Sequence, residues 1–317
     1  MLLVSRAADR ELDLVGQRLA AAGIPVERLD AESAADAGLV VDADRATVRI
    51  ADRWIAPSVT WIRHFTARAM PEQRGAATRI FTGQSWQALA DQLGAVSSSK
   101  LTGRGPGMLD QLVAARRCGI AAPRTIVTAD LARARELLNG PRVVIKAVHQ
   151  HFVEASPGLL TGVFPQVTDL GSLSASPGPG GPPVVVQDYV EHDQEIRAYF
   201  TRGEITAFRI SKDYPAQLWL EPELVSAGQI EPPPVIKEAV RALAGAMALE
   251  YGAFDFLSAQ GIPIFLEVNV SGDWRWLETK TGTPAVTNAV SSMLAGLHRE
   301  AAGVSRSPVN PISFLTG

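Results

Sequence analysis

The stretch IPIFLEVNVSGDWRWLE, residues 262–278, decides which fold this sequence encodes. It begins as an apolar strand, and then Glu267 and Asn269 appear two residues apart, just before a Ser-Gly turn. Because side chains on a strand alternate between the two faces of a sheet, Phe265, Glu267 and Asn269 are expected to share one face. Leu266 and Val268 are expected on the other. The strand therefore ends with two oxygen-bearing side chains on the same face.

A second acid is expected to lie beside this pair. Residues 252–270 have the pattern of two strands around a turn at Gln260-Gly261. Pairing of the two strands places Asp255 close to Glu267. Two carboxylates and an amide oxygen suit a hard divalent cation such as Mg²⁺, and two such acids would repel each other without a cation. The alternative is that both acids are solvated or paired with arginine and lysine.

Composition excludes several other classes of protein. The chain has 317 residues and a net charge of -3, which argues against a general nucleic-acid binder. No apolar run reaches the length of a membrane span, and the N-terminus does not have the pattern of a secretory signal. The single cysteine, Cys118, excludes an internal disulfide. These features are typical of a cytoplasmic protein.

The chain reads as three units of mixed α/β and α+β character. Residues 1–97 alternate between strand and helix patterns, with one strand expected at 46–55. Residues 98–186 form a second unit, and residues 187–317 form a third unit that holds the clearest strands and a hairpin. Within the second unit, the Gly-, Ser- and Pro-rich residues 169–183 predict a mobile surface loop.

Two lysines suggest what the cation site binds. Lys146 ends an apolar strand, and Lys100 lies in the sequence SSSKLTG. Cations near a magnesium and acid cluster suit a nucleoside triphosphate. The segment QDYV, residues 187–190, ends another apolar strand, and its backbone can hydrogen-bond an adenine edge. The alternative for the lysines is the ordinary charge of an edge strand.

The order of these elements resembles the ATP-grasp carboxylate–amine ligases, most strongly over residues 184–290. The resemblance implies an N-terminal pre-ATP-grasp α/β domain and two lobes that enclose ATP. It assigns Lys100 and Lys146 to the phosphates, Gln187, Tyr189 and Val190 to adenine, Asp193 to ribose, Arg197 to the γ-phosphate and the acyl phosphate, and Asp255, Glu267 and Asn269 to two magnesium ions.

Two further segments narrow the resemblance. The run LEVNVSGDWRWLETKTGTP at residues 266–284 and WIRHF at residues 61–65 are similar to the ATP-grasp ligases that macrocyclise ribosomal peptides, the graspetide or microviridin-type enzymes. This similarity implies a ribosomal precursor peptide as partner, with a leader and an acidic core. It also implies a cytoplasmic enzyme, and it leaves open whether this enzyme is a homodimer.

The resemblance implies activation of a carboxylate by ATP as an acyl phosphate, followed by displacement of phosphate by a nucleophile. Arg63, Arg209 and Lys212 are candidate anchors for an acidic peptide side chain, or else solvated surface charges. Trp274 and Trp276 either face a peptide groove or pack in the core.

The sequence departs from the family pattern in two places. The flap expected after Lys146, at residues 147–162, contains only Gly158 and Gly162. Its histidines, His149 and His151, have the spacing of two metal ligands on a strand, but with no third ligand they are interpreted as flap or surface residues. The segment after Lys100, where a helix is expected directly, contains three glycines: Gly103, Gly105 and Gly107.

Three functions are consistent with the sequence. The first is a peptide macrocyclase that joins Asp or Glu side chains to Ser or Thr hydroxyls or Lys amines. The second is a ligase that adds free amino acids to a peptide or small-molecule carboxylate. The third is a nucleotide-binding partner with a decayed site, against which the complete set of Lys146, Asp255, Glu267 and Asn269 argues.

Overall fold

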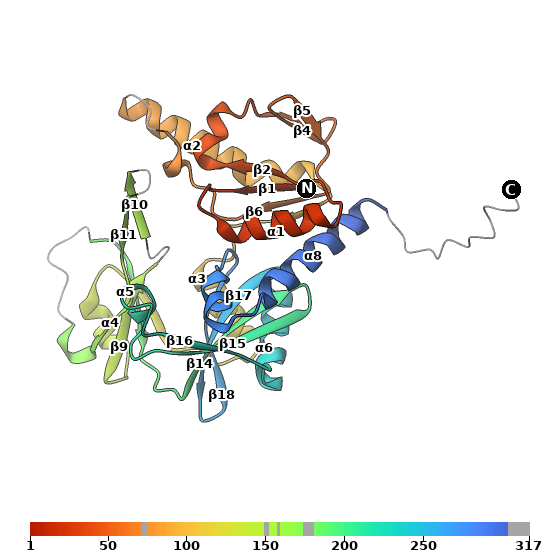
Figure 1. Ribbon diagram of the computed structural model, residues 1–317. Helices are drawn as coiled ribbons and strands as arrows, with labels where there is room; N and C mark the ends of the chain where they lie inside the picture. Colours follow the sequence, from red (N-terminus) through yellow and green to blue (C-terminus); the bar gives the residue numbers. More distant parts are fainter. Residues whose placement is uncertain (72–74, 149–151, 157–158, 174–180, 304–317) are drawn as a thin grey trace, which may run out of the picture.

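The computed structural model describes residues 1–71, 75–148, 152–156, 159–173 and 181–303. The predicted loop at 169–183 falls in part, at 174–180, outside these residues, as do His149 and His151. Within the described ranges, no helix is long and apolar enough to cross a membrane. Figure 1 shows three sheet-containing parts, with the N-terminal part above two lobes.

The N-terminal part is built on a four-stranded parallel sheet in the order β2-β1-β6-β7. The Asp9 side chain accepts a hydrogen bond from the Leu12 amide and so caps the first helix, α1. The elements are β1 (Leu2–Ser5), α1 (Arg10–Ala21), β2 (Glu27–Asp30), β6 (Val59–Ile62), α2 (Ala76–Gln92) and β7 (Ser99–Leu101).

The single strand expected at 46–55 is wrong. A turn at Ala51, which has a positive φ of 51°, divides it into two strands of a separate three-stranded sheet. These strands are β3 (Val40–Asp42), β4 (Thr47–Ile50) and β5 (Arg53–Ile55).

The central lobe contains an antiparallel sheet in the order β12-β9-β13-β8. Val143 and Val186 on one face pack with α4, so Lys146, three residues after Val143, lies on the opposite face. A separate hairpin follows Lys146. The elements are β8 (Thr125–Thr128), α4 (Leu131–Leu137), β9 (Arg142–Ala147), β10 (Phe152–Ser156), β11 (Leu159–Gly162), β12 (Gln166–Asp169) and β13 (Val184–Asp188).

The C-terminal lobe contains a five-stranded sheet in the order β16-β15-β14-β17-β18. Gln260 and Gly261 both have positive φ, which is the backbone of a two-residue hairpin turn, so the predicted hairpin is confirmed. The elements are β14 (Gln194–Thr201), β15 (Glu204–Ser211), α5 (Gln217–Leu220), β16 (Ser226–Ile230), α6 (Pro234–Ala246), β17 (Tyr251–Ala259), β18 (Ile262–Asn269), α7 (Arg275–Thr281) and α8 (Ala285–Ala301).

The two faces of this sheet have different neighbours. Ile196, Phe254 and Phe265 pack with α6 on one face. On the other face Tyr199 packs into a core shared with α8 and with Trp61 of the N-terminal sheet. Arg197, Asp255 and Glu267 lie on this second face, where Lys146 of the central lobe meets the sheet.

The borders between parts differ from those expected at residues 97 and 186. β7 extends the N-terminal sheet to Leu101 because it pairs with β6. Helix α3 (Met108–Arg117) then packs on β18 and α6, in the C-terminal lobe, with Ala115 in that core. The chain enters the central lobe only after α3.

Candidate active site

Asp255 and Glu267 face each other on neighbouring strands, as the hairpin pattern predicted. The expectation that Phe265 shares their face is wrong. The register shifts between Asp255 and Phe256, so that Phe256 pairs with Phe265 and Leu266 is the extra residue of a β-bulge. Phe265 therefore turns into the α6 core, and the bulge aims Glu267 onto the polar face beside Asp255.

Each of these acids has a basic partner from another strand. The Arg197 guanidinium donates two hydrogen bonds of 2.7 Å to the two carboxylate oxygens of Asp255. Lys146 Nζ, from the central lobe, lies 3.1 Å from Glu267 Oε2. Burial alone would lower the pKa of Arg197, but the Asp255 carboxylate outweighs it and raises that pKa well above its ordinary value. The two facing acids are thus flanked by two cations, Arg197 beside Asp255 and Lys146 beside Glu267.

Asn269 completes the oxygen set at the end of β18. Its side-chain oxygen accepts a hydrogen bond of 2.9 Å from the Ser271 amide, and the side chain is exposed. No group of three His, Cys, Asp or Glu side chains that could hold a metal exists among the described residues. Asp255, Glu267 and Asn269 supply carboxylate and amide oxygens, which are the donors that Mg²⁺ takes while keeping waters and phosphates. The donor set therefore fits magnesium bound together with a nucleotide.

The predicted hinge, residues 187–190, runs from the central lobe toward β14. Gln187 is buried, and its amide donates to Thr125 Oγ1 at 2.9 Å. The Tyr189 amide donates to the Arg142 carbonyl, and the Arg142 guanidinium lies 4.3 Å from the Tyr189 ring centroid. The Val190 N–H donates to no group in the described part of the chain. Of the hinge residues, Val190 thus offers the free backbone donor.

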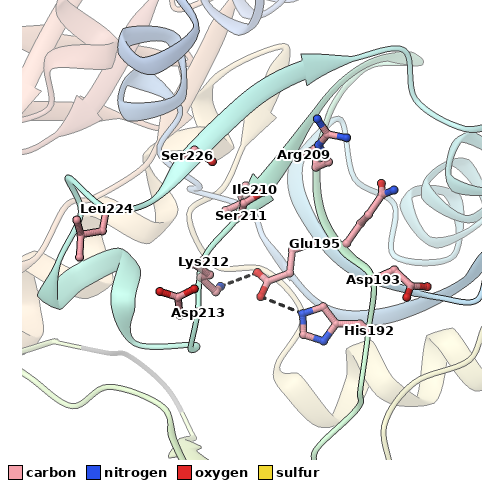
Figure 2. Close-up of a pocket in the computed structure, with 11 residues that line it drawn as sticks. His192, Asp193, Glu195, Arg209, Ile210, Ser211, Lys212, Asp213, Leu224 and Ser226 are labelled. Atoms are coloured by element: carbon pink, nitrogen blue, oxygen red, sulfur yellow. Dashed lines mark ion pairs between the residues drawn. The ribbon is translucent and has the colours of Figure 1, made fainter.

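A pocket of about 310 Å³ adjoins the hinge and is lined by Asp193, Glu195 and Lys212 among others. Figure 2 shows Lys212 and His192 pointing toward the Glu195 carboxylate from two sides, at 2.6 Å and 3.4 Å. Burial would raise the pKa of Glu195, but the hydrogen bond from His192 and the charge of Lys212 lower it. The Asp193 carboxylate accepts from the Gln260 amide at 2.8 Å.

Arg209, which the sequence suggested as an anchor, lines the same pocket but is not among the residues paired with Glu195. It pairs in register with Ile196, whose side chain is in the α6 core, whereas Arg197 pairs with Phe208. Period-two alternation therefore places Arg209 on the opposite face of the sheet from Arg197. In Figure 2 its side chain lies apart from the Glu195 carboxylate. Lys212, by contrast, is on the same face as Glu195 and is already paired with it.

Solved structures share the fold of this chain over nearly its whole length. The macrocyclase MdnC bound with precursor peptide MdnA from Microcystis aeruginosa MRC has 18% identity and a TM-score of 0.72, over 93% of this chain and 99% of that one. The ATP-grasp ligase PsnB complexed with minimal precursor, Mg and ADP has 17% identity and a TM-score of 0.73, over 94% and 98%. The Chryseobacterium gregarium RiPP-associated ATP-grasp ligase in complex with ADP and a leader and core peptide has 19% identity and a TM-score of 0.70, over 93% and 96%.

The chain has the ATP-grasp fold. This confirms the fold that the order of elements implied, most strongly over residues 184–290. No family model matches the sequence. No curated protein matches it either.

Within the ATP-grasp fold, Arg63 has a different place from the peptide anchor that the sequence suggested. Its side chain has no exposed surface, and it donates to Asp9 Oδ1 at 2.9 Å and to Asp273 Oδ1 at 2.8 Å. The guanidinium also lies 4.7 Å from the Trp274 ring centroid and 5.6 Å from that of Trp61. In this structure Arg63 joins the N-terminal sheet to the turn after β18 and is fully buried there.

Lys100 lies on β7, in register with Thr60, and is exposed. Its ammonium makes no hydrogen bond or ion pair with the described residues, whereas the Lys146 ammonium is bound to Glu267. The glycines that follow have a steric reason. A Cβ at Gly103 would lie 2.4 Å from the Arg63 carbonyl oxygen, and one at Gly105 would lie 2.6 Å from the Val270 side chain. Close passage of the backbone therefore delays the helix until Met108.

Residues 272–278, which have the pattern Gly-x-Trp-x-Trp-x-Glu, mainly stabilise the fold. Trp274 is fully buried, and its Nε1 donates to Thr287 Oγ1 at 2.9 Å. Of the two alternatives, a peptide groove or core packing, Trp274 therefore packs in the core. Glu278 accepts from both the amide and the hydroxyl of Thr287, so it ties α7 to α8. Trp276 is only partly buried, and its ring centroid lies 5.9 Å from the Arg197 guanidinium. Of the two tryptophans, Trp276 is the one that borders the site.

Sequence reasoning missed Gln111, which positions β18 of the ATP-grasp site. Its buried side-chain amide accepts from the Val268 N–H at 2.8 Å and donates to the Val268 carbonyl at 3.1 Å. Val268 stands between Glu267 and Asn269 on the edge strand, so Gln111 occupies the place of a neighbouring strand. Nothing in the sequence around Gln111 points to this contact, because it joins residues 157 positions apart.

Proposed function

We propose that the protein is an ATP-dependent ligase that activates Asp or Glu side chains of a ribosomal precursor peptide as acyl phosphates. Ring closure by a hydroxyl or amine of the same peptide then gives an ester or amide macrocycle. The observation that carries the proposal is the face where Arg197–Asp255 and Lys146–Glu267 meet across two lobes. The relatives with the same fold are bound to precursor peptides, and two of them also to ADP, which supports the same chemistry here.

The residues divide the work by charge. Asp255, Glu267 and Asn269 would hold magnesium, which neutralises charge on the phosphates. Lys146 supplies a buried ammonium beside the same acids. Arg197, held in a fixed orientation by two hydrogen bonds, would present its remaining N–H groups to the transferring phosphoryl group. Val190 and Asp193 would hold adenine and ribose at the hinge.

The remaining assignments are proposals of the same kind. Lys212 is retained as a polar contact for nucleotide or peptide beside the hinge, and Lys100 as a phosphate contact. The leader and acidic core of the peptide, the homodimer and the cytoplasmic location are expectations carried over from the sequence. PsnB is complexed with Mg and ADP, which supports ATP and magnesium as the cosubstrate and metal of this chain.

The test is incubation with ATP, Mg²⁺ and a panel of acidic peptides that includes MdnA, read by mass spectrometry and ADP release. Loss of one water per ring supports macrocyclisation. A mass gain by an added amino acid supports the second function, and no ATP turnover with any peptide would contradict both.

Variants locate the activity at the proposed site. Glu267→Gln is expected to lower ADP release by at least about 100-fold, the scale of losing one electrostatic contact to the transition state. Glu204→Gln, an exposed acid at the start of β15, is the matched control and should leave ADP release unchanged. Full ADP release by Glu267→Gln would refute the metal assignment.

A further inference from the structure

A histidine–aspartate pair lies next to the site and is not among the residues that the proposed function assigns to the activation step. His64 follows β6, and its Nε2 lies 2.8 Å from Asp273 Oδ1 in the turn after β18. The His64 side chain is 30% exposed, and its Nδ1 makes no hydrogen bond to any residue in the described part of the chain. The imidazole is thus held through one nitrogen while the other is open.

Asp273 is itself held firmly in place. Arg63 Nη2 donates to the same carboxylate at 2.8 Å, and the Tyr199 hydroxyl donates to the Asp273 backbone carbonyl at 2.5 Å. Burial would raise the pKa of Asp273, but the hydrogen bond from His64 and the charges of Arg63 and Arg197 lower it. An ionised Asp273 accepts the Nε2 proton of His64, and this fixes the imidazole with a free electron pair on Nδ1.

The position of the pair relative to the site follows from the strands that carry it. Asp273 stands four residues after Asn269 in sequence, and the Tyr199 that binds it lies two residues after Arg197 on β14. Tyr199 and Arg197 share one face of the sheet, since they alternate with Ala198. The pair therefore borders the end of the face that carries Arg197 and Asp255, on the side of the N-terminal domain.

We propose that His64 is the general base of ring closure, oriented by Asp273. This inference rests on the proposed function, because it needs an acyl phosphate on the peptide. His64 Nδ1 takes the proton of the attacking Ser or Thr hydroxyl, or of a neutral Lys amine, as the nucleophile forms its bond to the acyl carbon. The bond from that carbon to the phosphate oxygen breaks, phosphate leaves with the electron pair, and the proton passes from His64 to solvent.

Charges of both signs surround the His64 imidazole. Asp273 favours the protonated ring after proton transfer, with Asp9 behind Arg63 adding negative charge. Arg63 and Arg197 are permanent cations that oppose it. Burial raises the pKa of Tyr199, so its hydroxyl stays neutral. Only the neutral imidazole has an electron pair on Nδ1 with which to accept the proton, so the base acts in its uncharged form.

The experiment separates activation from ring closure. Hydroxylamine attacks acyl phosphates without a base and gives a hydroxamate, so it reports activation alone. With MdnA or another panel peptide that the wild type cyclises, His64→Gln should form hydroxamate within about twofold of the wild-type rate. Its water loss should slow by about 10²- to 10⁴-fold, the usual contribution of a general base. Its ring-closure rate should also lack the acid limb of the wild-type pH profile.

Matched controls distinguish a chemical role from a structural one. His298→Gln removes a histidine on α8 whose Nδ1 is bound to Ser58, and it should leave both steps unchanged. Added imidazole should restore ring closure to His64→Ala, as expected when a missing base is replaced.

Each other outcome overturns something specific. Ring closure by His64→Gln at the wild-type rate would refute the role of His64 as general base. Loss of hydroxamate formation in His64→Gln, with thermal unfolding unchanged, would refute it as well. No hydroxamate from the wild type with any peptide would refute the proposed function, and the base with it. Hydroxamate without rings in the wild type would refute macrocyclisation alone. The rate of acyl transfer to an added amine would then test the base. Equal rates in the wild type and His64→Gln would refute it, and a slower rate in His64→Gln would support it.

Discussion

Replacement of Arg63 by methionine tests whether this arginine stabilises the fold or binds substrate. The substitution keeps the aliphatic packing between two tryptophan rings and removes the charge. Asp9, whose side chain is fully buried, then loses its ion partner. Removing one member of a buried ion pair costs about 3–5 kcal/mol. The more exposed Asp273 adds little, because its carboxylate is 58% exposed and regains water. A loss of 3–5 kcal/mol is a large share of the usual 5–15 kcal/mol of folding stability.

A double variant checks the cause of that loss. Asp9→Asn retains an oxygen that can accept from the Leu12 amide and cap α1, but it removes the buried negative charge. Arg63→Met combined with Asp9→Asn should therefore be more stable than Arg63→Met alone by at least about 1 kcal/mol, beyond the usual error of additivity. Urea unfolding followed by circular dichroism measures all three proteins.

The opposite pattern would refute this reasoning. If Arg63→Met unfolds within about 0.5 kcal/mol of the wild type, as surface substitutions do, then Arg63 does not stabilise the interface. A raised KM for an acidic peptide with unchanged stability would restore the role of a peptide anchor.

Three further predictions follow from other contacts. Gln111→Leu leaves two buried backbone groups of β18 unpaired and should lower the free energy of unfolding by about 2–4 kcal/mol, against no change for the exposed control Gln92→Leu. The pKa of His192 is raised above 6.5, chiefly by its hydrogen bond to Glu195, so the ion pair stabilises the protein below pH 6.5 and this contribution is lost as pH rises through the folded-state value. Wild-type stability should accordingly fall more steeply above pH 6.5 than that of His192→Gln, and parallel curves in urea unfolding would contradict this. MgADP at about 100 times its Kd should raise stability by about 2.7 kcal/mol, with most of the rise in melting temperature lost on adding EDTA.

The parts of the site that sequence predicts are those fixed by local periodicity. Alternation along two strands and a two-residue turn were enough to bring Asp255 opposite Glu267. The same rule failed at Phe265, because the extra residue Leu266 shifts the register and no residue type marks a bulge reliably. For Arg209 the alternation rule holds. Its side chain lies on the face opposite Phe208, but the sequence does not tell which face of β15 packs on the core.

Burial between distant elements could not be predicted from the sequence. Arg63 reads as a surface cation because only the assembled fold brings Asp9 and Asp273 to it. The glycines after Lys100 look like a departure from the family pattern, yet they are required where the chain crosses Arg63 and Val270. In both cases the deciding neighbour is far away in sequence.

The path of the chain through α3 makes the central lobe an insertion within the C-terminal lobe. The backbone leaves after Ala121, which bridges to Ile264, and returns past Asp188, whose amide donates to the Arg124 carbonyl. The segment that enters the central lobe and the segment that leaves it are therefore neighbours. A rotation of the inserted lobe would turn about these two segments. Such a rotation would lengthen Lys146–Glu267, which joins the two lobes, and leave Arg197–Asp255, within one sheet, unchanged. The first ion pair therefore depends on the position of the inserted lobe, and the second does not.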